Sequence, residues 1–147
     1  MAIPEKIKEK ARQYFPLLTS IRHHLHAHPE LSYKEFETSA FVRRQLESFG
    51  IPFKVMAETG VVGLIEGNDP GSRVVALRAD MDALPITEEN NVSYRSKNPG
   101  VMHACGHDVH TSCLLGAAKI LSETKNEWNG TVKLIFQPGE ERSRIMR

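Results

Sequence analysis

The sequence predicts an α/β protein in which a mixed β-sheet is flanked by helices. Three observations lead to this prediction. Apolar side chains recur at three- and four-residue steps through most of the first 50 residues, as they do in amphipathic helices. Short apolar runs typical of strands follow between residues 53 and 78 and again at 131–136. Between these runs lie a long polar stretch, residues 79–105, and one further helical pattern, residues 109–123.

The composition is that of an ordinary globular protein of one domain. The 147 residues are 40% hydrophobic and 25% charged, and the formal net charge is +1. So small a charge gives no attraction to nucleic acid or to an anionic membrane, so we expect neither as a partner. The N-terminus lacks the apolar core of a secretory signal, and no apolar run is long enough to span a bilayer. The cytoplasm is therefore the expected compartment.

Two helices are expected before residue 51. Within residues 4–28, Pro16 lacks the N–H that an interior helical hydrogen bond needs, so we expect two pieces with a break or kink. The second helix follows Ser32, which forms a capping-box pattern with Glu35. Gly50 stands where a glycine commonly ends a helix.

The strand patterns predict an antiparallel pair followed by a long loop. Residues 61–65 and 73–78 flank the turn cluster 67–71, which suggests direct pairing, and the second run looks largely buried. Residues 79–105 are read as a loop, a feature that is functional or disordered when it is this long. After the turn at Asn129-Gly130, residues 131–136 form the last expected strand.

The stretch Met102–His110 concentrates metal-binding side chains just before a helix. It contains one thiol, three imidazoles and a carboxylate, and thiolate and imidazole are ligands of zinc-like metals. Gly106 lets the backbone bend so that Cys105 and His107 face the same point. The alternative is a polar loop whose histidines cap helix ends. Asp108 is expected to serve chiefly as the N-cap of the following helix.

A second group of candidate residues follows the last strand. Pro138 and Gly139 break that strand, so Glu140 and Glu141 can both turn toward one centre instead of pointing to opposite faces. A bound cation would remove the repulsion between the two carboxylates. Hydrolysis needs one carboxylate on the metal and another that accepts a proton from water. The alternative is a solvated pair of glutamates at a strand end.

Several other polar side chains have simpler interpretations. Asp80 or Asp82 is expected either to support a ligating imidazole from behind or to form a salt bridge with Arg78. Cys113 is interpreted as a small buried residue of the helix core, and a disulfide with Cys105 is not expected in a reducing compartment. A solvated or packing role is expected for four early histidines, His23, His24, His26 and His28.

Four blocks of sequence, taken in order, resemble the amidohydrolase branch of the M20 metallopeptidase superfamily. That branch includes hippurate hydrolases, aminoacylases that deacylate N-acyl amino acids, and auxin-conjugate hydrolases. The resemblance covers nearly the whole chain up to residue 141. The blocks are His23–Ser32, Arg78–Pro85, Met102–Asp108 and Gly130–Glu141.

The resemblance implies a fold, a chemistry and a set of site residues. It implies the N-terminal portion of a zinc-exopeptidase-like catalytic domain, and metal-dependent hydrolysis of N-acyl amino acids such as hippurate. Two divalent metal ions are implied, zinc or manganese, with cobalt or nickel as alternatives. By the same resemblance, Cys105 bridges the two ions, while His107 and Glu141 are further ligands. Glu140 is the general base and acid, and Asp82 is the carboxylate that supports the ligands from behind.

The chain departs from the family pattern after the glutamate pair. The family continues with glycine-rich sequence, whereas here Arg142–Arg147 follows and the chain ends. We therefore expect residues 1–147 to be a truncated catalytic domain without the later histidine ligands or the lid and dimerisation domain. A non-native ending at 142–147 is a hypothesis. Hydrolysis by such a chain should be weak or absent, and the alternative function is non-catalytic metal binding or protein interaction.

Overall fold

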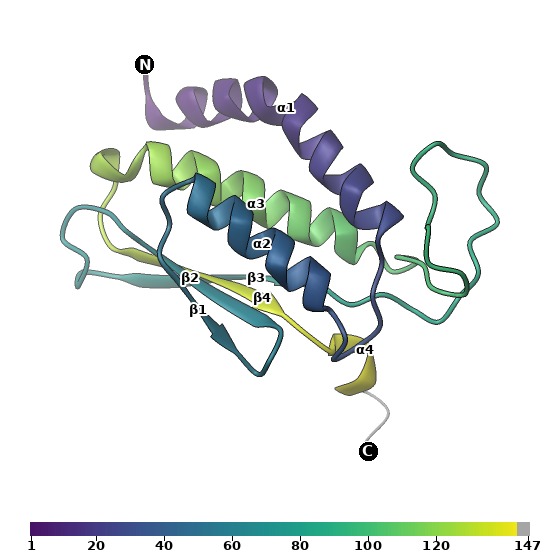
Figure 1. The fold of residues 1–147 in the computed structure, drawn as a ribbon. Helices are drawn as coiled ribbons and strands as arrows, with labels where there is room; N and C mark the ends of the chain where they lie inside the picture. Colours follow the sequence, from purple (N-terminus) through teal and green to yellow (C-terminus); the bar gives the residue numbers. More distant parts are fainter. Residues whose placement is uncertain (144–147) are drawn as a thin grey trace.

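The structure is a computed structural model that describes residues 1–143. Helices α1, α2 and α3 lie on one side of a four-stranded sheet (Figure 1). The elements, in chain order, are α1 (Ile3–Ala27), α2 (Phe36–Ser48), β1 (Phe53–Met56), β2 (Gly60–Glu66), β3 (Val74–Asp80), α3 (His107–Glu123), a 3-10 turn (Lys125–Glu127), β4 (Thr131–Gln137) and α4 (Glu140–Ser143). The predicted α/β class with a mixed sheet is confirmed.

The strands are arranged in the order β1-β2-β4-β3. β2 pairs antiparallel with β1 and with β4, whereas β3 and β4 are parallel. The predicted pairing of residues 61–65 with 73–78 is therefore wrong, because β4 lies between these two strands. The buried side chains of β4 alternate along the strand, at Val132, Leu134 and Phe136, which suits a central strand with one face on the core.

The hairpin partner of β2 is instead β1. The two strands join through a tight turn in which Ala57 and Glu58 both have positive φ, of 50° and 64°. Met56 pairs with Gly60, so three residues form the connection, a common length for a hairpin loop. β3 is also less buried than its sequence suggested: Val74 is 63% exposed and Val75 43% exposed. Within the described residues β3 is an edge strand, which explains this exposure.

Helix α1 is continuous through Pro16, so the prediction of two separate pieces is wrong. The helix nevertheless bends partway along its length, as Figure 1 shows, in agreement with the kink expected at a proline. α1 packs chiefly on α3, where Gly116 faces Leu18. A Cβ atom at Gly116 would lie 2.6 Å from a methyl carbon of Leu18, so the glycine permits this close approach of the two helices.

Helix α2 begins differently from the capping-box prediction, which is wrong. The Ser32 hydroxyl donates to the distant carboxylate of Asp82 at 2.6 Å and caps no helix. The backbone N–H groups of Glu37 and Thr38 donate instead to the carboxylate of Glu30, at 3.1 and 2.8 Å. This places a negative charge at the positive end of the helix dipole. The far end of α2 agrees with prediction, since Gly50 has a φ of +69°.

Glu35 is fully buried and joins three segments of the chain. Its carboxylate accepts hydrogen bonds from the backbone N–H of Tyr33, the hydroxyl of Thr59 and the backbone N–H of Gly139, at 2.9, 2.9 and 2.8 Å. Gly139 connects β4 to α4. The buried carboxylate therefore fixes the point at which the chain leaves the sheet and turns into α4.

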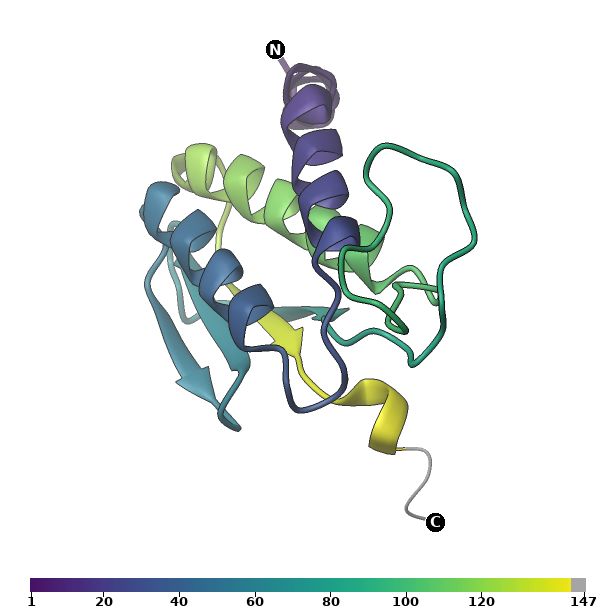
Figure 2. The ribbon, with the colours of Figure 1, turned by 45° about the vertical axis from the view of Figure 1, so that its right-hand side comes forward.

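The core lies between the helices and the sheet. Leu46 of α2, Leu115 of α3, Val61 of β2 and Leu134 of β4 are completely buried in it. The predicted long loop is present between β3 and α3, and Figure 2 shows it beside the C-terminal half of α1. Two backbone hydrogen bonds between Leu84 and Met102 close its base. Along residues 1–143, no helix has the length and apolar character needed to cross a bilayer.

Replacing Glu35 with alanine should destabilise the fold strongly. The substitution leaves two backbone N–H groups and one hydroxyl buried without an acceptor, which should lower the free energy of unfolding by about 3 kcal/mol or more. Urea denaturation measures this change. Glu47→Ala, at an exposed position of helix α2, is the control and should cost about 0.5 kcal/mol or less. A loss below about 1 kcal/mol at Glu35 would contradict the proposed anchoring role.

Candidate metal centre

Three segments that carry titratable side chains meet at one end of the sheet, where the carboxyl ends of β3 and β4 lie. β3 and β4 are parallel neighbours, so their carboxyl ends lie side by side. Asp82 follows β3, and Glu140 and Glu141 follow β4 as the first residues of α4. The N-terminus of α3, which begins at His107, lies against the same end. In open α/β sheets this end is the usual position of a binding site.

His107 is held in one orientation by the end of β3. Gly106 precedes it with a φ of +84°, a left-handed conformation that glycine adopts without strain, and the helix begins at the next residue. Nδ1–H of His107 donates to the backbone carbonyl oxygen of Asp82 at 2.8 Å. In the neutral ring the other nitrogen, Nε2, then carries the lone pair, and it lies 3.8 Å from Oε1 of Glu141.

Glu140 and Glu141 both approach His107. Gly139 has a φ of +64°, which ends the strand and starts the short helix α4. Adjacent residues of a helix point about 100° apart, so two neighbouring carboxylates can approach one point, which they cannot do on a strand. One ligand atom each from His107, Glu140 and Glu141 lie within 4.8 Å of one another. Such a group is the size of a metal-binding site.

The buried carboxylate of Asp82 supports this group from behind. It is 1% exposed and accepts hydrogen bonds from the Ser32 hydroxyl at 2.6 Å and the Glu141 backbone N–H at 2.9 Å. Its other oxygen lies 3.2 Å from Nδ1 of His107. Burial by itself would raise the pKa of Asp82, but the contacts with His107, Ser32 and Glu141 outweigh it and lower the pKa to about 2. Asp82 is thus ionised at neutral pH.

The same contact acts on the imidazole. The Asp82 carboxylate raises the pKa of His107 above its ordinary value, against the opposite effect of burial, because a negative neighbour stabilises the charged ring. Asp80 has a different role from Asp82. It accepts two hydrogen bonds from the guanidinium of Arg78, at 2.6 and 2.8 Å. The salt bridge with Arg78 is thus formed by Asp80, whereas Asp82 contacts the imidazole of His107.

A family model for peptidase family M20/M25/M40 matches residues 76–146. An N-acyl-L-amino acid amidohydrolase of Geobacillus stearothermophilus is 50% identical over 138 residues, which cover 93% of this chain and 37% of that protein. The IAA-amino acid hydrolase ILR1-like 5 of Arabidopsis thaliana is 51% identical over 134 residues, 90% of this chain and 30% of that protein. The chain is therefore similar to members of the M20 peptidase family over most of its length.

The fold of the chain agrees with that of a solved M20 relative. The YXEP protein of Bacillus subtilis, described as a dinuclear metal binding peptidase from the M20 family, superposes with a TM-score of 0.84 at 45% identity. The match covers 88% of this chain and 37% of that one. The chain thus spans about a third of the length of the curated relatives that it matches.

The structure places Cys105 on the loop immediately before Gly106, where its side chain is exposed and forms no disulfide. Within the described part of the chain, Cys105 is not a member of either cluster of metal-ligand geometry. The second cluster consists of Asp80, His107 and His110. His110 was not singled out as a ligand from the sequence, although it lies one helical turn after His107, the spacing at which two side chains share a helix face.

Two sequence predictions near the site are wrong. Asp108 is not the N-cap of α3, because the helix already begins at His107 and Gly106 is the capping residue. Asp108 is buried instead, with Oδ2 2.7 Å from Nδ1 of His26 and 2.9 Å from Nε of Arg22. Cys113 is exposed and not part of the core, since α3 turns that position away from the buried face formed by residues such as Leu114 and Leu115.

His26 connects the start of α3 to the long loop. It lies between two buried carboxylates, with Nδ1 near Asp108 and Nε2 2.9 Å from Oε1 of Glu88. Glu88 also accepts hydrogen bonds from the backbone N–H of Ser96 at 2.6 Å and from Asn90 at 3.2 Å. Of the early histidines, His26 is thus a packing residue in a charged network, in agreement with the structural role expected for it.

His103, on the same loop, differs from its neighbours. It is 5% exposed, and neither ring nitrogen has a hydrogen-bond partner among the described residues. Burial lowers the pKa of His103 to about 4, so the ring is neutral at neutral pH. Nothing in its sequence position distinguished it from the histidines on either side, because only the folded loop removes it from water.

The network around Glu88 predicts a pH dependence of stability. Burial would raise the pKa of Glu88, but the bonds from Ser96, His26 and Asn90 lower it from 4.5 to about 2. Because the folded pKa is depressed, the contribution to stability is complete above about pH 4.5. It falls by about 1.4 kcal/mol per pH unit below that value, until the pH approaches 2.

Glu88→Gln removes this titration. Urea unfolding measured between pH 6 and pH 3 should show a difference between wild type and variant that shrinks as the pH falls. Glu89→Gln, at the neighbouring exposed position, is the control and should follow the wild-type curve. A difference between wild type and Glu88→Gln that stayed constant over this range would show that Glu88 has an ordinary pKa.

Proposed function

We propose that this chain supplies metal-binding and proton-transfer groups of an M20 amidohydrolase that hydrolyses N-acyl amino acids. The observation that carries the proposal is the convergence of His107, Glu140 and Glu141 within 4.8 Å, with ionised Asp82 behind the imidazole. In this proposal residues 1–147 form the N-terminal part of the catalytic domain. The M20 relatives named above support hydrolysis of amide bonds in small acyl amino acids.

The donor atoms present fit a divalent cation. In the neutral imidazole, Nε2 of His107 is the nitrogen that can bind a cation, and it lies 3.8 Å from Oε1 of Glu141, while Asp82 fixes the orientation of the ring. Two adjacent carboxylates near one imidazole repel each other unless a positive charge lies between them. We assign Cys105, His107 and Glu141 as ligands of a site for two divalent ions, zinc or manganese. The B. subtilis relative, described as a dinuclear metal binding peptidase, supports the number of ions. Such ions, when bound, polarise a carbonyl group and make water more acidic.

The remaining chemistry falls to the side chains of the chain itself. Glu140 stands beside the ligand Glu141 and accepts a proton from the attacking water at a carboxylate oxygen. It then delivers this proton to the departing amine nitrogen, so that one group serves as base and acid in turn. Asp82 keeps Nδ1 of His107 protonated, which leaves Nε2 available as a ligand.

Metal binding should depend on Asp82 as well as on the ligands. Asp82→Asn is expected to lower the affinity for Mn²⁺ or Zn²⁺ by about 10- to 100-fold, because the imidazole loses the charge that orients it. Equilibrium dialysis followed by elemental analysis measures the affinity. Asp69→Asn, at an exposed turn position, is a matched control with the same change of charge. Equal metal affinities of the wild type and Asp82→Asn would contradict the role of Asp82 in metal binding.

Glu140→Gln should separate metal binding from catalysis. The variant is expected to retain bound metal but to lose hydrolysis of hippurate and N-acetyl amino acids by about 100-fold or more relative to wild type. Because the chain covers about a third of its relatives, we expect low turnover, which mass spectrometry of the released amino acid detects. Glu58→Gln, at an exposed turn, is the control.

The outcomes of this experiment discriminate between functions. Hydrolysis that a chelator and Glu140→Gln both abolish supports the amidohydrolase. Hydrolysis that persists in Glu140→Gln contradicts the role of Glu140, and inhibition by a thiol alkylator but not by a chelator would point to a cysteine nucleophile. Metal uptake without any hydrolysis would favour the non-catalytic metal-binding alternative.

A further inference from the structure

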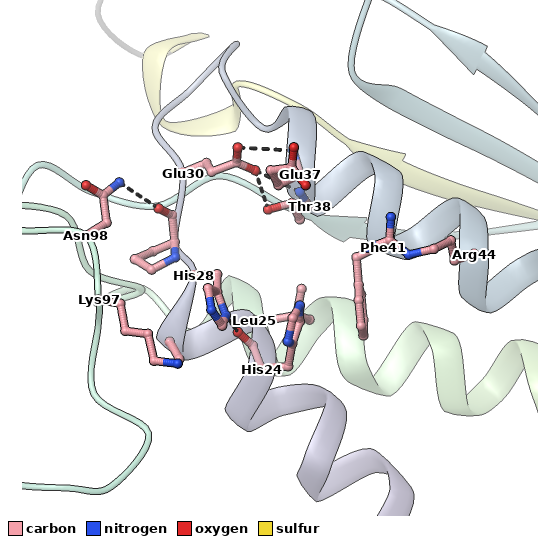
Figure 3. Close-up of a pocket in the computed structure, with 12 residues that line it drawn as sticks. His24, Leu25, His28, Glu30, Glu37, Thr38, Phe41, Arg44, Lys97 and Asn98 are labelled. Carbon is pink, nitrogen blue, oxygen red and sulfur yellow. Dashed lines mark hydrogen bonds between the residues drawn. The ribbon is translucent and has the colours of Figure 1, made fainter.

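A cavity of about 290 Å³ lies apart from the metal centre, between the end of α1, the first half of α2 and residues 97–98 of the long loop. Figure 3 shows that Lys97 stands at one end of this cavity and Arg44 at the other, with His24, His28 and Phe41 between them. None of His107, Glu140 or Glu141 lines it. Its volume is at the lower limit of small-molecule sites, so any ligand must be small.

The cations at the two ends of the cavity are the side chains of Arg44 and Lys97. Within residues 1–143, neither the guanidinium of Arg44 nor the ammonium of Lys97 forms an ion pair or a side-chain hydrogen bond. Their charges act on the middle of the cavity, because the pKa of His24 is lowered by burial and then by the positive charges of His28, Arg44 and Lys97. The charges of both end residues therefore reach the imidazole in the middle of the cavity.

The middle of the cavity is apolar and aromatic. The Phe41 ring stacks on the His24 ring, with centroids 4.4 Å apart and planes inclined by 21°. The buried side chains of Leu25 and Pro29 also line the cavity. An apolar segment of a ligand would lose contact with water here, which is favourable. The cavity thus has a cation at each end, Lys97 and Arg44, and an apolar, aromatic surface between them.

Two acidic residues, Glu30 and Glu37, also line the cavity, and the carboxylate of one of them is already engaged. The Glu30 carboxylate is already engaged at the N-terminus of α2, where it accepts hydrogen bonds from two backbone N–H groups and from the Thr38 hydroxyl at 2.7 Å. Its charge is therefore offset by the helix dipole. Glu37 is exposed on the first turn of α2 and is the one lining carboxylate without such an engagement among the described residues.

We propose that this cavity binds a small organic dianion, in which two carboxylate groups are joined by an apolar spacer. One carboxylate pairs with Lys97 and the other with Arg44, while the spacer lies along Phe41 and His24. A ligand with one carboxylate leaves one of the two cations unpaired, so it binds less tightly. This site uses none of the residues of the metal centre and does not rest on the amidohydrolase proposal.

Titration with matched acids tests the proposal. Metal-free protein, prepared on a chelating resin so that the metal centre does not bind carboxylates, is titrated with linear dicarboxylates from hexanedioate to dodecanedioate. Monocarboxylates of the same chain lengths are the reference ligands. Calorimetry measures affinity, and the imidazole proton signals of His24 and His28 report binding in the cavity. For the best chain length we expect the dianion to bind about fivefold more tightly than its monoanion, the worth of one exposed ion pair.

Arg44→Gln and Lys97→Gln should each abolish this preference, because each removes the partner of one carboxylate. Both side chains are exposed and unpaired, so the variants should fold as wild type does. Arg12→Gln and Lys54→Gln remove the same charges at exposed positions outside the cavity and should keep the preference. Equal affinities for dianion and monoanion, a preference that survives in both cavity variants, or no binding of either acid would each overturn the proposal.

Discussion

The carboxylate of Asp82 is the interaction on which the arrangement of the candidate site depends. It receives the Ser32 hydroxyl, the Glu141 backbone N–H and the imidazole of His107, and Asp82 itself is only 1% exposed. A buried charge is costly unless several donors satisfy it, and here these donors come from three separate segments. The same bonds that keep Asp82 ionised therefore hold the start of α3 and the start of α4 at fixed positions.

A second buried carboxylate completes this arrangement from the other side. Glu35 holds the N–H of Gly139, so the turn from β4 into α4 is fixed before the chain reaches Glu140. Asp108 and Glu88, through His26, fix the first turn of α3 and the long loop in the same way. Buried polar side chains thus hold separate elements together through hydrogen bonds and ion pairs. They do so where the site is carried by loops and helix ends.

Much of the local structure was predictable because its causes lie within a few residues. The period of the apolar side chains located α3 and β4, and Gly50 marked the end of α2 through its freedom to adopt positive φ. The predictions that failed depended on partners far away in the chain. Ser32 has the pattern of an N-cap, yet its hydroxyl bonds Asp82, 50 residues further along. Asp108 likewise has the pattern of a cap but is buried against His26.

By itself, the sequence determined the α/β class, the positions of most helices and strands, and the chemistry of the side chains at the site. These features follow from local periodicity and from residue type. The tertiary structure alone decided that β4 lies between β2 and β3, and that Glu140 and Glu141 meet His107. Strand order and such convergence depend on which distant surfaces bury each other, a competition among long-range contacts that no short pattern encodes.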